Sequence, residues 1–148
     1  SVDNAVFERL LTDPYFTAYP PKSLDRDAFS GVCMPGLSLE DGAATLAMFT
    51  VRSIGLALEH FPAPPDQWIV CGGGRLNYYI MDCLARELPG AVATSDALGW
   101  NGDAIEAQAF AFLAIRSILG LPISFPGTTG VVEPLTGGRL HVPANSRM

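Results

Sequence analysis

The spacing of hydrophobic residues changes along the chain, and this change predicts alternating helices and strands. Apolar residues recur every three or four positions within residues 4–12, 39–60, 77–88 and 103–119, which is the period of an amphipathic helix. Residues 67–71 and 91–94 are instead short apolar runs between turn residues, as expected for strands. A strand, a helix and a second strand in this order favour a parallel pair joined by a right-handed crossover. The chain is therefore predicted to have an α/β fold.

The first predicted strand is followed by three glycines, Gly72, Gly73 and Gly74, and then by a helix that begins near Asn77. Consecutive glycines remove every Cβ atom from a turn and cost backbone entropy on folding. Either the turn is tight so that the helix can pack on the sheet, or a ligand approaches the backbone closely, as nucleotides do in many α/β folds. Because Asn77 stands where a dinucleotide-binding motif has its last glycine, a Rossmann fold is not favoured.

Two of the predicted helices have informative termini. Asp3 or Asn4 caps the first helix, and Ser38 with Asp41 forms a capping box before the long helix at residues 39–60. The last helix is apolar on nearly all sides and is predicted to be buried on most of them. Glu106 in its first turn either complements the helix dipole at the surface or faces a cleft and handles protons.

The loops provide further candidates. Pro20 and Pro21 stiffen the backbone before Lys22, which either is a solvated charge or reaches a phosphate or sugar oxygen. Residues 95–102 follow the second strand at the carboxyl edge of the sheet, where ligands bind in such folds. The tail from residue 124 onward is predicted to be extended, with an edge strand near residues 131–132.

Composition restricts the class of protein. The 148 residues are 49% hydrophobic and 16% charged, which excludes a disordered chain and fits one domain covering residues 1–148. A net charge of −6 without a Lys/Arg cluster argues against general binding to nucleic acid or anionic membranes. The cysteines Cys33, Cys71 and Cys83 lack metal-binding spacing and read as core thiols, and neither a signal peptide nor a membrane span is evident. We therefore expect a cytoplasmic protein without a metal site of its own.

Several motifs in the same order resemble the C-terminal part of anhydro-N-acetylmuramic acid kinases, members of the sugar kinase, Hsp70 and actin superfamily. The matching stretches are PPKS (20–23), ED (40–41) with ATL (44–46), VCGGG (70–74) with Asn77, GDAIEAQAFAFLA (102–114), LPISFPGTTG (121–130) and TGGR (136–139). The resemblance covers nearly the whole chain.

This resemblance implies a ribonuclease-H-like C-terminal lobe, incomplete, with helices packed on a small mixed sheet. It implies an enzyme of cell-wall recycling that uses ATP and magnesium, adds water across the 1,6-anhydro bond of anhydro-N-acetylmuramic acid and phosphorylates the released 6-oxygen. By the same resemblance Gly72, Gly73, Gly74 and Asn77 bind adenosine, and Glu106 lies near the sugar in a supporting catalytic role. Lys22, on its stiffened loop, is a further candidate for binding the sugar substrate.

The chain lacks the N-terminal lobe of this family, with its Gly-Thr-Ser phosphate loop, and the segment that holds the catalytic aspartate. Phosphoryl transfer depends on positioning and charge neutralisation, so we expect the chain alone to be inactive. Two alternatives remain open: a non-catalytic module that binds sugar or nucleotide, and a structural lobe that pairs two chains as a homodimer.

Overall fold

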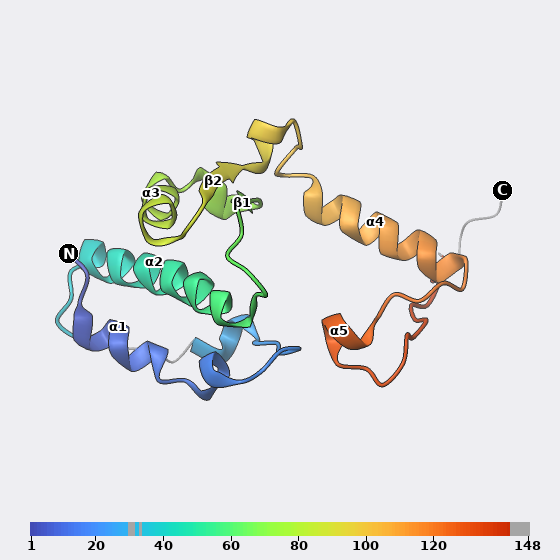
Figure 1. Cartoon of the computed structure of the whole chain (residues 1–148), viewed down its shortest axis with the longest axis horizontal. Coiled ribbons are helices and arrows are strands. Elements are labelled where there is room, and N and C mark those ends of the chain that lie inside the picture. The colour runs from blue at the N-terminus through green and yellow to red at the C-terminus, as the bar shows by residue number, and fades with distance from the viewer. Residues whose placement is uncertain (30–31, 33, 143–148) are drawn as a thin grey trace. The chain divides into compact units, whose positions relative to one another are not determined.

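The computed structural model describes residues 1–29, 32 and 34–142. Its contacts divide the chain into two compact units, Ser1–Ile105 and Glu106–Met148. The first unit contains α1 (Asn4–Leu11), α2 (Leu39–Leu56), β1 (Gln67–Val70), α3 (Tyr78–Glu87) and β2 (Ala91–Thr94), and α4 (Ile105–Ile118) leads into the second unit, which also contains α5 (Pro126–Thr129) (Figure 1). Short 3-10 turns lie between them at η1 (Pro14–Thr17), η2 (Arg26–Phe29), η3 (Ala57–His60), η4 (Gly73–Leu76) and η5 (Ser95–Leu98). The prediction of a single domain stays a prediction.

Local capping positions the helices of the first unit where the sequence predicts them. The Asp3 carboxylate accepts a hydrogen bond from the Val6 N–H at 2.9 Å, and the Ser38 hydroxyl accepts one from the Asp41 N–H at 3.1 Å. Each bond satisfies a backbone donor that has no partner within the helix. Thr45, inside α2, donates to the Asp41 carbonyl one turn back, as most helix-interior threonines do.

The two strands form a parallel pair, with Gln67 opposite Ala91 and Val70 opposite Thr94, and α3 is the crossover between them. The predicted parallel pairing is confirmed. The sheet is parallel rather than mixed in the part of the chain that the structure describes. The predicted edge strand at residues 131–132 is wrong, because neither residue is in a strand; the one bridge in the tail up to residue 142 is antiparallel and joins Ser124 to Leu135.

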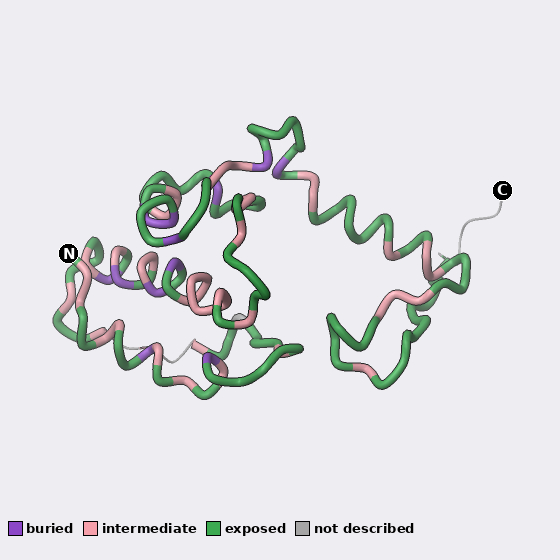
Figure 2. Tube along the Cα trace, in the orientation of Figure 1, coloured by how far each residue is buried: buried purple, intermediate pink, exposed green. Residues whose placement is uncertain are grey.

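The core of the first unit lies on both sides of α2, which runs between α1 and α3 (Figure 1). On the side of α3 and the sheet, Val51 and Leu84 are fully buried; on the side of α1, Phe49 and Phe16 pack with ring centroids 5.7 Å apart. Figure 2 shows buried positions on all three helices. Each strand is exposed at its first residue and half-buried at the other three.

The second unit leaves α4 exposed, so the predicted burial of this helix is wrong. Phe110, Phe112 and Ile118 are each at least 60% exposed. Figure 2 shows α4 as exposed and intermediate, with no buried stretch. Within this unit the tail covers only part of the helix, where the Ser117 hydroxyl donates to the Gly137 carbonyl and the Arg116 guanidinium donates to the Pro122 carbonyl.

The cysteines divide between core and surface. Cys83 is fully buried on α3, as predicted, but Cys71 at the end of β1 is exposed, so its assignment to the core is wrong. Cys33 lies outside the described residues. Among the helices that the structure describes, none has the length and apolar character to cross a membrane.

Candidate functional site

The glycine turn, Gly72 to Gly74, is open to solvent at the carboxyl end of β1. Gly72 has φ +69°, in the region that favours glycine, and Gly73 begins the 3-10 turn η4. A Cβ atom built on Gly72, Gly73 or Gly74 would meet no atom within 4 Å. The turn is therefore bare, and no neighbouring side chain fills the space beside it.

Backbone donors face this space. The N–H groups of Gly73 and Gly74 donate to no acceptor among the residues that the structure describes, whereas the next N–H, of Arg75, donates to the Gly72 carbonyl at 3.3 Å. Unpaired, exposed N–H groups on a backbone without side chains can bind a polar or anionic group at close range.

Asn77 ends the 3-10 turn and caps α3. Its side-chain oxygen accepts from the N–H groups of Tyr79 and Ile80 at 3.1 and 3.2 Å. The helix therefore begins one 3-10 turn after the glycines and not directly at them. The oxygen of Asn77 is occupied by the cap, which leaves the side-chain NH₂ group on an exposed residue to contact a ligand.

The loop after β2, residues 95–103, lies next to the glycine turn because parallel strands end at the same edge of the sheet. Arg75 joins the two: its Nε donates to the Asp96 carboxylate at 2.6 Å, and its Nη1 donates to Asp103 at 2.8 Å and to the Gly72 carbonyl at 2.9 Å. The Arg75 side chain is 4% exposed. The predicted position of residues 95–102 at the carboxyl edge of the sheet is confirmed, and the contacts of Arg75 add that this loop touches the glycine turn.

Arg75 also sets the charge of this edge. Its hydrogen bonds lower the pKa of Asp96 and of Asp103, although partial burial of each carboxylate opposes the shift. The bonds to Asp103 and Asp96 raise the pKa of Arg75 in turn. All three groups are thus ionised at neutral pH, and the edge beneath the glycine turn carries one net negative charge.

Ser95, between β2 and Asp96, is fully buried, and its hydroxyl has no hydrogen-bond partner in the described part of the chain. Such a group costs free energy unless it is satisfied.

The structure gives Lys22 local partners. Its ammonium donates to the Tyr15 carbonyl at 2.9 Å and to the Phe16 carbonyl at 3.4 Å, and lies 4.6 Å from the centre of the Tyr15 ring. These contacts hold Lys22 against η1 rather than beside the glycine turn. Glu106 is exposed in the first turn of α4 and belongs to the second unit, where it is placed to complement the helix dipole.

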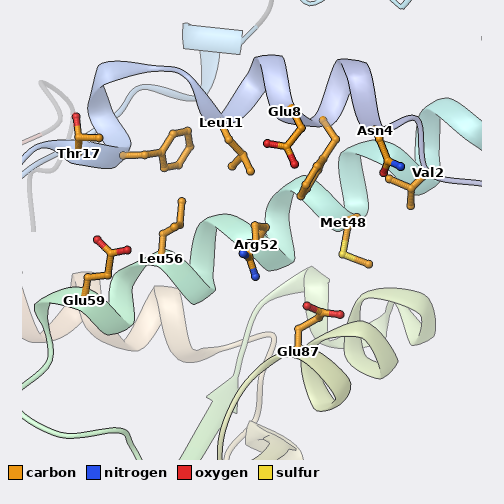
Figure 3. A pocket seen from close by; sticks show the side chains of 12 residues that line it. Val2, Asn4, Glu8, Leu11, Thr17, Met48, Arg52, Leu56, Glu59 and Glu87 are labelled. Atoms are coloured by element: carbon orange, nitrogen blue, oxygen red, sulfur yellow. The ribbon is translucent and has the colours of Figure 1, made fainter.

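A separate groove of about 490 Å³ lies along α1 and α2 (Figure 3). Glu8 lines it from α1, Arg52 and Met48 line it from α2, and Glu87 lines it from α3. It contains none of the site residues that the sequence predicts.

Comparison with known proteins identifies the relatives of this chain. A sequence profile described as anhydro-N-acetylmuramic acid kinase matches residues 1–142. The chain belongs to the anhydro-N-acetylmuramic acid kinase family.

Family members named anhydro-N-acetylmuramic acid kinase support this assignment. The chain is 56% identical over 137 residues to that of Rhodospirillum rubrum, covering 93% of this chain and 36% of the relative. The protein of Rhizorhabdus wittichii is 53% identical over 143 residues, which is 97% of this chain and 39% of the relative. The protein of Caulobacter vibrioides is 54% identical over 139 residues, which is 94% of this chain and 38% of the relative. The chain thus spans little more than a third of the length of the curated relatives it matches.

The sequence resemblance leads us to expect ATP and magnesium, and the described residues fit the nucleotide better than the metal ion. The glycine turn has room for a group lying against its backbone. In contrast, no group of three or more His, Cys, Asp or Glu side chains among the described residues could hold a metal ion. Asp96 and Asp103 are already bonded to Arg75. The described residues therefore do not form a magnesium site of their own.

Arg75 was not among the predicted site residues. It directly follows the glycines and is the buried cation at this edge, but its partners are 21 and 28 positions away along the chain. The usable signal was a lone arginine in an otherwise apolar and glycine-rich stretch, together with acidic residues in the loop after the second strand.

Proposed function

We propose that this chain is the C-terminal, ribonuclease-H-like lobe of a kinase that uses ATP to convert 1,6-anhydro-N-acetylmuramic acid into N-acetylmuramic acid 6-phosphate. The reaction adds water across the anhydro bond and phosphorylates the 6-oxygen, a step of cytoplasmic cell-wall recycling. Membership of the family supports the kinase assignment.

The observation that carries the role of this chain is the bare glycine turn. In this proposal the adenosine of ATP lies against Gly72, Gly73 and Gly74, because no side chain occupies that space. The free N–H groups of Gly73 and Gly74 and the NH₂ group of Asn77 donate to its polar atoms. Bound ATP supplies the phosphoryl group and brings magnesium with it.

Glu106 and Lys22 belong to the sugar side of the proposal. Glu106 is an exposed carboxylate that can orient a hydroxyl group or a water molecule. Lys22 first has to leave the Tyr15 carbonyl to reach a sugar oxygen, so its role is the weaker of the two. In this proposal the chain supplies the adenosine site and part of the sugar side.

The test is calorimetric titration of the 148-residue chain with ATP and magnesium and, separately, with the anhydro-sugar. We expect weak ATP binding that Gly73→Val abolishes, because the valine fills the space above the turn. Gly73 lacks a positive φ and has no neighbour within 4 Å, so the variant should fold with an unchanged melting temperature. Ala63→Val, at an exposed position of the linker before β1, is the matched control.

Each outcome separates the alternatives. ATP binding that persists in Gly73→Val, or no ATP binding at all, contradicts the adenosine site. Sugar binding without ATP binding supports a non-catalytic sugar module instead.

A second candidate function is a structural role, favoured by the exposed apolar residues of α4 such as Phe110 and Ile118. In this role the second unit pairs two copies of the chain. Sedimentation analysis that finds a dimer, together with no ligand binding, supports it.

A further inference from the structure

Arg75 is a charged side chain buried inside the first unit. Its side chain is 4% exposed, whereas those of its partners Asp96 and Asp103 are 50% and 75% exposed. Burying a charge is costly unless it is paired and hydrogen-bonded. The two carboxylates could remain in water without Arg75, so the arrangement calls for a reason beyond satisfying them.

The contacts of Arg75 join three segments of the chain. It bonds the carbonyl of Gly72 in the turn after β1, the carboxylate of Asp96 in η5 after β2, and the carboxylate of Asp103 just before α4. Gly102 completes the enclosure, because a Cβ atom there would lie 2.2 Å from the Arg75 Nε. The guanidinium thus fills a closely fitting space between the glycine turn and the β2 loop.

The glycine turn cannot fix its own conformation. Three consecutive glycines have the largest backbone freedom of any tripeptide, and no side chain packs against Gly73 or Gly74. The Gly74 carbonyl accepts from the Asn77 N–H at the end of the turn. At its start, the Gly72 carbonyl accepts from both the Arg75 N–H and the Arg75 Nη1, and Nη1 is the one side-chain donor to the turn among the described residues. With this carbonyl drawn to Arg75, the N–H groups of Gly73 and Gly74 remain exposed.

We propose that Arg75 is a positioning residue for the nucleotide site, which fixes the glycine turn through the Gly72 carbonyl and anchors it to Asp96 and Asp103. It acts without contacting the ligand, because its side chain is only 4% exposed and its guanidinium is bonded to Asp96, Asp103 and the Gly72 carbonyl. This inference rests on the proposed nucleotide site and adds the residue that preorganises it.

Arginine is required here because of its geometry. Its planar guanidinium presents several donors in fixed directions, so Nε and Nη1 can bond different partners at the same time. The single ammonium of a lysine keeps the charge but cannot reproduce this fork. Arg75→Lys therefore keeps the positive charge at this position but removes the hydrogen bonds that hold the turn, so it tests the hydrogen bonds alone.

The experiment compares Arg75→Lys with Arg86→Lys in the 148-residue chain. Arg86 is an exposed arginine on α3 that pairs with Asp82 at 2.9 Å, so the control makes the same chemical change away from the turn. Thermal unfolding establishes that both variants fold. Two-dimensional ¹⁵N NMR then follows the amide signals of Gly72, Gly73 and Gly74, and calorimetry measures the dissociation constant of ATP.

We expect Arg75→Lys to shift or broaden the three glycine signals while those of Val51 and Leu84 in the core stay in place. The affinity for ATP should fall roughly tenfold, the size typical when a residue that holds a binding group in place is replaced. Arg86→Lys should change neither. A merely structural role would lower the melting temperature but leave the glycine signals and the affinity of the folded protein unchanged.

Two results would overturn the inference. One is a folded Arg75→Lys whose glycine signals match those of the wild type. The other is a change of these signals with an affinity within about twofold of the wild type, a difference of less than half a kcal/mol. If the wild-type chain binds no ATP, the proposed function fails, while the glycine signals still report whether Arg75 holds the turn.

Discussion

Replacing Gly102 with alanine tests how closely Arg75 is enclosed. Gly102 is buried, and an alanine Cβ would lie 2.2 Å from the Arg75 Nε and 2.6 Å from Cζ. Ordinary contacts begin at 3.4 Å, so either the guanidinium or the loop must move by about 1.2 Å. The Arg75 Nε bond to Asp96, now 2.6 Å long, cannot survive that movement unchanged.

The expected cost is that of overpacking, about 1–3 kcal/mol of unfolding free energy. Gly74→Ala is the matched control, because it makes the same substitution where no atom lies within 4 Å and φ is not positive. Removing backbone freedom from the unfolded chain should leave that variant unchanged or more stable by about 0.4–1 kcal/mol. Urea unfolding monitored by circular dichroism measures both. Equal stabilities for the two variants would refute the close enclosure of Arg75.

Two further predictions concern charge and core. Arg75 lowers the pKa of Asp103 below its ordinary value of 3.8, so this stabilisation is complete above that pH and is lost as the pH falls through the lowered pKa. Urea unfolding from neutral to acid pH should therefore show Asp103→Asn to be less stable than the wild type near neutrality, with the difference vanishing in acid. Asp82→Asn, which removes an exposed carboxylate on α3, is the control. A difference that stays constant with pH, or an equal effect of Asp82→Asn, contradicts the pairing of Asp103 with Arg75. Leu84→Ala should lose about 2–5 kcal/mol of unfolding free energy, because Leu84 is 1% exposed. Leu39→Ala should lose little, because Leu39 is 86% exposed. Similar losses in the two variants would show that Leu84 is not part of the core.

The sequence predicts the local features of the first unit well because they depend on neighbouring residues. The caps at Asp3 and Ser38 each use a donor three positions further along the chain. The parallel pair follows from the order of strand, helix and strand.

Features that depend on distant residues were not predicted. The apolar spacing predicts α2 as a helix but not that it has two packing partners: Val51 is buried on the side of α3, and Phe49 is buried on the side of α1. Periodicity identifies a face but not how many neighbours a helix has. For the same reason the apolar character of α4 suggests burial, although Phe110 and Phe112 are exposed in the second unit.

The candidate site was predicted in part. Its location at the glycine turn follows from residues close together in sequence, since the strand, the glycines and Asn77 are consecutive. The pairing of Arg75 with Asp96 and Asp103 does not, because one sequence gives no means of matching a cation to carboxylates in another loop. Lys22 illustrates the same difficulty, since the carbonyl of Tyr15 that binds it leaves no trace in the side-chain pattern.

The glycines themselves help to choose between a packing turn and a ligand-binding turn. Where this fold needs a glycine for packing, the contact is evident: a Cβ atom on Gly90 would lie 2.5 Å from the Pro65 carbonyl oxygen, and one on Gly102 would overlap Arg75. At Gly73 and Gly74 nothing lies within 4 Å, and φ is not positive at either. Neither packing nor backbone conformation thus requires the absence of side chains there. A ligand that lies against this backbone would account for it, which is the role proposed above for the turn.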